Sequence, residues 1–140
     1  MLDIDSLAVD PAAAEGGVWA NFMGARFLIA RHNNEAGAFL RSKLALQNWD
    51  TLSGGGEEAE KVAADISAQV IANHILLNWE GVSKAGEPLE YTPELGLKYL
   101  TDPRFRDLQQ FIENFSLNRG NYREKAEEEV ADSVKDSAVS

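Results

Sequence analysis

The chain has 140 residues, which is enough for one domain with a modest hydrophobic core. Its 23 acidic residues outnumber its 13 basic residues, and the net charge of −10 argues against binding of a nucleic-acid backbone, which needs clustered lysine and arginine. Cysteine is absent, so disulfides, thiol catalysis and cysteine metal sites are excluded, and we expect a reducing, intracellular setting.

The first 17 residues include four acidic residues and no lysine or arginine. They therefore lack the features of a secretory signal, and no apolar run in the chain approaches the roughly 20 residues that span a membrane. We expect residues 1–17 to be a flexible acidic lead-in with one helical turn. Residues 18–123 are expected to form a single globular domain.

Two short runs rich in aromatic and β-branched residues, 18–22 and 26–31, flank Met23-Gly24-Ala25. This pattern predicts an N-terminal β-hairpin, whose apolar face must pack on helices or on another chain. Asn33 or Asn34 can then cap a helix that begins near Glu35. The side chains expected to supply the apolar contacts of this helix are Ala36, Phe39, Leu40 and Leu44.

A second helix is predicted from Glu57 to Trp79, and its last ten residues are apolar almost all round, which is typical of a buried segment or an oligomer interface. Residues 79–93 contain two glycines and two prolines, and we interpret them as a structural clasp that leads to a helix capped by Thr92. Thr101-Asp102-Pro103 begins a last helix. Residues 124–140 are acidic and small, which predicts a frayed helix or a disordered tail.

Together these elements predict an α+β, predominantly α-helical fold, in which an N-terminal β-hairpin packs on about four helices between flexible acidic termini. No pattern of catalytic or metal-binding residues accompanies them. His74 has Val70 and Asn78 four residues away on either side, so it is not part of a zinc motif. Gly54-Gly55-Gly56 lacks the Lys-Ser/Thr of a phosphate loop. We therefore expect no enzymatic activity, no cofactor and no metal.

Three tryptophans and six phenylalanines are more than a thin helical domain easily covers, so some should line a partner groove or an oligomer interface. The alternative is that these aromatic residues are core anchors. The positions that we single out as candidate partner-binding or interface residues are Trp19, Phe22, Ile71, Ile75, Trp79 and Tyr91.

Several segments between residues 17 and 123 resemble the tail assembly chaperones of long-tailed (siphovirus-like) bacteriophages. These segments are Val18-Trp19, Phe27-Leu28-Ile29-Ala30-Arg31, Leu77-Asn78-Trp79-Glu80-Gly81-Val82, Gly86-Glu87-Pro88-Leu89-Glu90-Tyr91-Thr92-Pro93-Glu94, Leu100-Thr101-Asp102-Pro103-Arg104-Phe105-Arg106-Asp107 and Asn121-Tyr122-Arg123. The resemblance implies a protein that binds and solubilises the tape-measure protein and helps to recruit tail-tube subunits. It also implies a location in the host cytoplasm and absence from the mature virion.

The expected partners are thus the phage tape-measure protein, the tail-tube protein and further copies of the chain in a homo-oligomer, with neither nucleic acid nor membrane among them. In many such phages a programmed frameshift adds a C-terminal domain to a minority product, and this chain would be the shorter form. Two other functions stay open: a structural tail-completion or connector protein of the virion, and an acidic host-directed inhibitor or DNA mimic.

Overall fold

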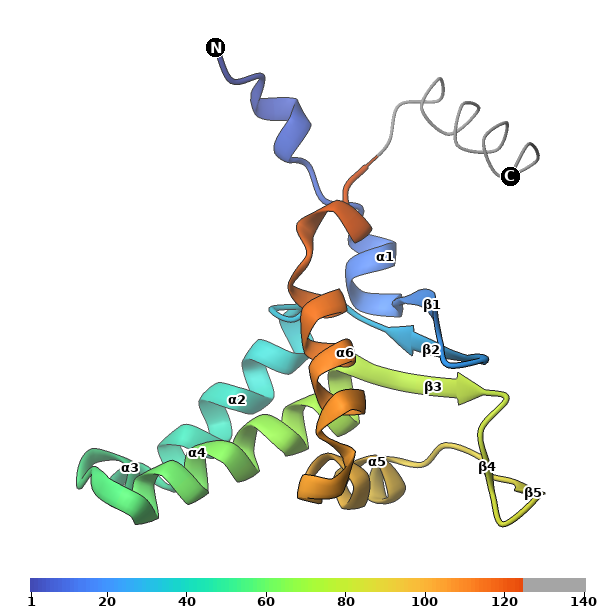
Figure 1. Cartoon of the computed structure of the whole chain (residues 1–140). Coiled ribbons are helices and arrows are strands. Elements are labelled where there is room, and N and C mark those ends of the chain that lie inside the picture. The colour runs from blue at the N-terminus through green and yellow to red at the C-terminus, as the bar shows by residue number, and fades with distance from the viewer. Residues whose placement is uncertain (125–140) are drawn as a thin grey trace.

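The computed structural model describes residues 1–124 and confirms the predicted α+β, mainly helical fold. Figure 1 shows a small antiparallel sheet with α6 lying across it and with two long helices, α2 and α4, projecting away. The elements in chain order are η1 (Ile4–Leu7), α1 (Pro11–Gly16), β1 (Val18–Phe22), β2 (Ala25–Ile29), α2 (Glu35–Gln47), α3 (Trp49–Ser53), α4 (Gly56–Val70), η2 (Ile71–Ile75), β3 (Leu76–Glu80), β4 (Ser83–Lys84), β5 (Glu87–Pro88), α5 (Pro93–Leu100), η3 (Pro103–Phe105), α6 (Arg106–Leu117) and η4 (Arg119–Asn121).

The predicted N-terminal hairpin is confirmed. Strands β1 and β2 pair antiparallel, with Phe22 opposite Ala25 at the end of the hairpin. The two residues between them, Met23 and Gly24, have φ values of 53° and 83°. Two successive residues with positive φ form the tight turn that matches the twist of antiparallel strands, so the hairpin is closed by local geometry.

The prediction of one continuous helix over 57–79 is wrong at its C-terminal end. Helix α4 ends at Val70, the single π-helical turn η2 follows, and Leu76–Glu80 forms strand β3. A short apolar run is compatible with either a buried helix or a buried strand, so its periodicity does not separate the two. Here β3 pairs with β2 and places Trp79 opposite Phe27, which extends a marginal hairpin to three strands.

Helices α2 and α4 form a helical hairpin, closed by α3, that we call the helical arm (Figure 1). Of the two predicted caps, Asn33 and Asn34, it is Asn34 whose side-chain oxygen accepts a hydrogen bond from the Gly37 amide, at 2.8 Å. Leu40 and Leu44 pack against the core as expected, but Phe39 is exposed. Neighbouring helical residues point about 100° apart, so an arm only two helices thick covers Leu40 and leaves Phe39 outside.

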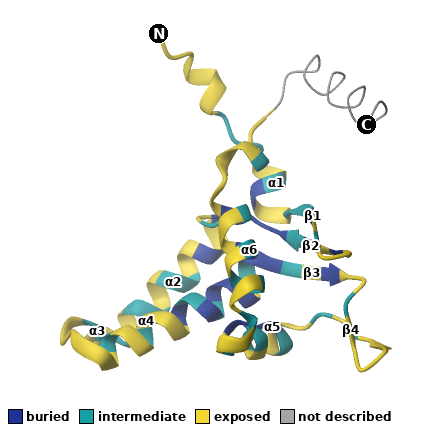
Figure 2. Cartoon of the chain, in the orientation of Figure 1, coloured by how far each residue is buried: buried dark blue, intermediate teal, exposed yellow. Residues whose placement is uncertain are grey.

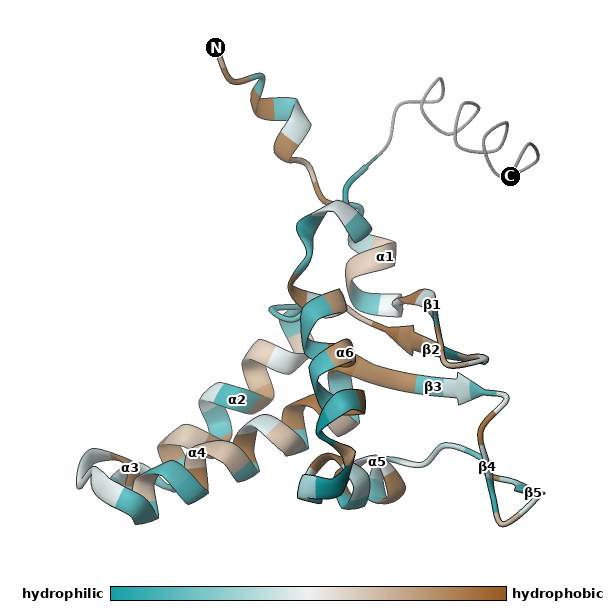
Figure 3. Cartoon of the chain, in the orientation of Figure 1, coloured by the Kyte–Doolittle hydropathy of each residue, from teal (hydrophilic) through white to brown (hydrophobic). Residues whose placement is uncertain are grey.

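The core lies between one face of the sheet, the end of α4 with η2, and the helices α5 and α6. Phe22 stacks on Phe111 of α6 with ring centroids 4.4 Å apart, and Phe27 meets Trp79 edge-on at 6.3 Å. Figure 2 shows the buried residues concentrated in β2, β3 and the end of α4, while the tip of the arm is exposed. In the hydropathy colours of Figure 3, β2 and the first part of β3 are brown, while the end of β3 is teal to white.

The two ends of the described chain meet at Tyr122. Its buried side chain donates a hydrogen bond from the hydroxyl to the Ile29 carbonyl at 2.9 Å, and its own carbonyl accepts one from the Asp10 amide at 2.8 Å. Val9 pairs with Arg123 beside this contact. The predicted lead-in, residues 1–17, contains η1 and α1. The predicted acidic tail, residues 124–140, lies outside the described residues apart from Glu124.

Candidate functional site

Three of the six predicted interface residues lie inside the folded chain. Ile71, Ile75 and Trp79 are each at most 5% exposed and belong to the hydrophobic core. The apolar segment around η2 is covered by the chain's own sheet and by α5, so it needs no partner to be buried. These side chains stabilise the domain, and we do not include Ile71 or Ile75 in a partner surface.

The other three predicted residues are half-buried. Phe22 is held in the stack with Phe111, and the Tyr91 hydroxyl donates a hydrogen bond to the Ala72 carbonyl. Trp19 lies on the sheet face opposite to the core, with the Arg26 guanidinium 4.5 Å above its ring. Each of these aromatic side chains thus already has a partner within the chain.

A groove of about 470 Å³ opens beside Trp79, and we call it the aromatic groove. It lies between the β3–β5 segment and the corner formed by α5, η3 and the start of α6. The apolar side chains that line it are Phe27, Trp79, Val82, Leu89, Tyr99, Phe105 and Leu108. Its size and apolar lining are typical of a pocket that accepts a small ligand or a few side chains of a partner.

The predicted clasp over residues 79–93 forms one wall of the aromatic groove. The Trp79 indole N–H donates a hydrogen bond to the Leu89 carbonyl at 2.6 Å, and the Leu89 amide donates to the Val82 carbonyl at 2.9 Å. Between these contacts, Ala85 and Gly86 turn the chain with positive φ so that β4 and β5 pair. The segment does tie the core to the Pro93 helix, because Trp79 holds its far end at Leu89, but it begins at strand β3 and not at the predicted apolar helix.

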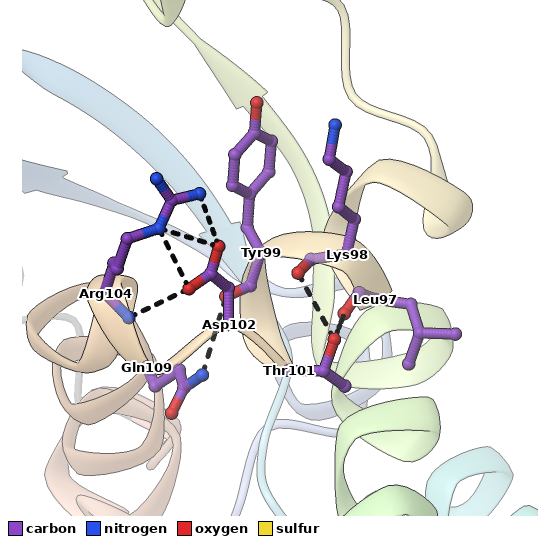
Figure 4. Close-up of polar contacts among 7 residues, drawn as sticks. All are labelled: Leu97, Lys98, Tyr99, Thr101, Asp102, Arg104 and Gln109. Atoms are coloured by element: carbon purple, nitrogen blue, oxygen red, sulfur yellow. Dashed lines mark hydrogen bonds and ion pairs between the residues drawn. The ribbon is translucent and has the colours of Figure 1, made fainter.

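The opposite wall is the corner between α5 and α6, shown in Figure 4. The Thr101 hydroxyl donates to the Leu97 carbonyl at 2.8 Å, which ends α5, and the Gln109 amide of α6 donates to the Leu100 carbonyl. These contacts satisfy carbonyls at the end of α5 and set the angle between the two helices. Tyr99, on the last turn of α5, is thereby held against the groove.

The polar rim of the aromatic groove is mainly cationic. Arg104 donates to Asp102 at 2.7 Å, and these side-chain hydrogen bonds hold the pKa of the Asp102 carboxyl below its usual value. Lys84 and Lys98 also line the groove and form no salt bridge with any residue of the described chain. An acidic protein thus has an apolar groove bordered by two lysines without a salt bridge, of which Lys98 lies 5.8 Å from the centroid of the Tyr99 ring. This lining suits an apolar side chain flanked by carboxylates.

A second apolar surface lies on the helical arm. Phe39, Leu46 and Trp49 are 74%, 75% and 62% exposed, and we call these three residues the apolar ridge. Phe39 and Leu46 are seven residues apart and therefore project from the same face of α2. The sequence contains this seven-residue spacing, but because Phe39 was expected on the buried face of the helix, the spacing did not predict an exposed surface.

Neither the aromatic groove nor the apolar ridge brings together the side chains of a catalytic or metal-binding site. Among residues 1–124 no group of three or more histidine, cysteine, aspartate or glutamate side chains is arranged to hold a metal ion. The helices in that part of the chain are also too short or too polar to cross a bilayer. His32 has a buried Nδ1 without a hydrogen-bond partner in the described structure, and burial lowers its pKa.

Comparison with known proteins identified a family. No curated protein and no solved structure matched the chain. The family model described as YdaY prophage protein matches residues 31–133, or 103 of the 140 residues, and its range includes α2 to η4. Both the aromatic groove from β3 onward and the apolar ridge lie within the matched range. The chain is therefore phage-associated and belongs to the YdaY prophage protein family.

Proposed function

We propose that this protein is a tail assembly chaperone that binds the phage tape-measure protein through the apolar ridge. The observation that carries the proposal is the exposure of Phe39, Leu46 and Trp49 on an arm that projects from the body of a highly acidic chain. Large exposed apolar side chains, two of them on one face of α2 and the third at the start of α3, are typical of a surface that binds another protein. The membership in a prophage family and the resemblance to tail assembly chaperones point to a phage client.

The geometry of the ridge suits a helical client. Two exposed side chains on one face of α2, followed by Trp49 at the start of α3, can pack against the apolar stripe of an amphipathic helix. Burial of a few hundred Å² of apolar surface contributes about 5–10 kcal/mol before the loss of motional freedom is subtracted, so the net affinity of one copy is modest. Modest affinity is appropriate for a chaperone that must leave its client during tail assembly.

In the same proposal, the net charge of −10 keeps the chaperone and its client dispersed. A chain that exposes apolar side chains tends to self-aggregate, and like-charge repulsion between copies opposes this tendency. A client coated with such chains would acquire their negative charge and stay dispersed. We place this step in the host cytoplasm, before the tail-tube subunits assemble around the tape-measure protein, with the chaperone absent from the mature virion.

Co-expression with the tape-measure protein of the same phage tests the proposal. We expect the wild-type chain to raise the soluble fraction of the client and to co-purify with it, and the double variant Phe39→Ser/Leu46→Ser to do neither. Met23→Ser is the matched control, because Met23 is 89% exposed but lies at the β1–β2 turn, away from the arm. A wild-type chain that leaves client solubility unchanged, or a ridge variant as active as the wild type, would refute the proposed function.

Mass spectrometry of purified virions addresses the alternative of a permanent tail component. We expect the protein in infected lysate and not in the particle. A stoichiometric amount of the protein in particles would favour a tail-completion or connector role instead.

A further inference from the structure

The structure leaves one exposed segment whose chemistry matches the aromatic groove. Residues Leu2–Leu7 carry exposed apolar side chains at Leu2 and Ile4, which are 70% and 71% exposed, alternating with the carboxylates of Asp3 and Asp5. Ile4 and Leu7 are three residues apart in the 3₁₀ helix η1 and so project from the same side of it. We infer that the aromatic groove binds Leu2–Leu7 of a second copy of this chain.

Charge complementarity selects this occupant. The groove combines an apolar floor with Lys84 and Lys98, and the segment offers apolar side chains separated by two carboxylates. The chain as a whole has 23 acidic residues against 13 basic residues, so an acidic segment meets net repulsion from the molecule at large. What distinguishes the groove is that its two lysines border an apolar lining, so both the carboxylates and the apolar side chains of the segment find partners there.

The segment cannot reach the groove of its own chain. The pairing of Val9 with Arg123 and the hydrogen bond from the Asp10 amide to the Tyr122 carbonyl fix the chain directly after η1. Figure 1 shows the N-terminus at one end of the molecule and the β4–β5 and α5 region that forms the groove at the other. The occupant must come from a neighbouring copy, which makes the contact head-to-tail.

Such a contact can be made reciprocally by two copies, which gives a twofold dimer, or it can repeat from copy to copy, which gives a ring or an open chain. The helical arm takes no part in this contact, so the apolar ridge of every copy stays free. The contact is small compared with the roughly 1,200–2,000 Å² of a stable interface, and we therefore expect weak, concentration-dependent association. The inference concerns a different surface from the proposed client site, and its test needs no client.

Charge reversal on each side of the contact tests the inference with full-length chains. Variant A carries Asp3→Asn and Asp5→Lys, which keeps a capping side chain at position 3 and makes the segment basic. Variant B carries Lys84→Glu and Lys98→Glu, which makes the groove rim acidic. Variant C carries Lys43→Glu and Lys61→Glu, which change the net charge as much as variant B does at exposed positions outside the groove. Circular dichroism establishes that each variant is folded.

Sedimentation equilibrium over a range of concentrations gives the association constant of each chain. We expect the wild type and variant C to associate, and variants A and B alone to associate at least about tenfold more weakly. An equimolar mixture of A and B should recover wild-type association, because each chain then offers the partner that the other requires. A monomeric wild type, undiminished association of A and B, or a mixture that stays dissociated would overturn the inference.

The outcome is separable from that of the proposed function. Loss of association in variant B with normal binding of a short fragment of the tape-measure protein would leave the proposed client site intact. Loss of association in variant C but not in B would assign self-contact to the helical arm, where Lys43 and Lys61 lie, and overturn the role of the groove.

Discussion

The replacement of Trp79 by alanine measures how much the clasp over residues 79–93 contributes to the fold. Trp79 is 5% exposed, packs edge-on against Tyr91 with ring centroids 4.8 Å apart, and donates its indole N–H to the Leu89 carbonyl. Truncation of a buried tryptophan to alanine removes this packing and leaves a cavity. We expect the variant to lose about 3–5 kcal/mol of unfolding free energy.

The indole hydrogen bond can be separated from the packing. Trp79→Phe keeps an aromatic ring but leaves the Leu89 carbonyl without its donor. The unmade bond costs about 1–2 kcal/mol and the smaller ring adds a modest packing loss, so this variant should lie between the wild type and Trp79→Ala. The matched control is Trp49→Ala on the apolar ridge, which is 62% exposed and should change stability by less than about 0.5 kcal/mol.

Urea unfolding followed by far-ultraviolet circular dichroism is the appropriate assay, because tryptophan fluorescence changes with the substitutions themselves. The midpoint and the slope together give the free energy of unfolding for each variant. Equal losses for Trp79→Ala and Trp49→Ala, or a loss below about 1 kcal/mol for Trp79→Ala, would show that Trp79 does not anchor the clasp to the core.

Three further predictions concern stability. Gly96→Ala would place a Cβ 2.9 Å from a ring carbon of Tyr91. Despite the better helix propensity of alanine, we expect this variant to lose about 1–2 kcal/mol of unfolding free energy, measured by urea unfolding. Gly54→Ala, whose new Cβ would have its nearest neighbour at 3.5 Å, should be close to neutral. Burial raises the pKa of the Tyr122 hydroxyl, so the unfolded state releases this proton at a lower pH than the folded state does. Stability should therefore fall as the pH rises above about 10, and Tyr122→Phe should flatten that fall. Burial lowers the pKa of His32 from its usual 6.5, so the unfolded state binds this proton more readily and stability should fall as the pH drops through 6.5. A His32→Gln variant whose stability changes with pH as steeply as that of the wild type, between about pH 7 and 5, would contradict this.

The parts of the fold that could be predicted from the sequence depend on local chemistry. Asn34, Thr92 and Asp102 each accept a hydrogen bond from an amide two or three residues ahead, so a capping residue in the sequence is sufficient to place each helix start. The Met23-Gly24 turn likewise needs only its own backbone geometry and the two flanking strand patterns. These features require no knowledge of where distant segments lie.

The parts that could not be predicted depend on contacts distant in the sequence. The assignment of Leu76–Glu80 to a strand follows from pairing with β2, about fifty residues earlier, and no periodicity in the run itself favours a strand over a helix. The aromatic groove is likewise formed by three separate segments, so its lining could not be assembled from the sequence. The exposure of Phe39 depends on which face of α2 packs against α4, and the apolar pattern of α2 does not determine that face.

The ridge and the groove lie on different elements, and this separation bears on how weak contacts could act on a long client. If copies associate head-to-tail through the groove, each added copy brings another ridge formed by Phe39, Leu46 and Trp49 to the same assembly. Once one ridge binds, the next binds the same client at a high effective concentration, so total affinity grows without a stronger individual contact. Variant B should then solubilise a long tape-measure protein less efficiently than a short fragment of it, whereas loss of the ridge should abolish binding of both. Equal efficiency of variant B on the two clients would mean that copies act singly.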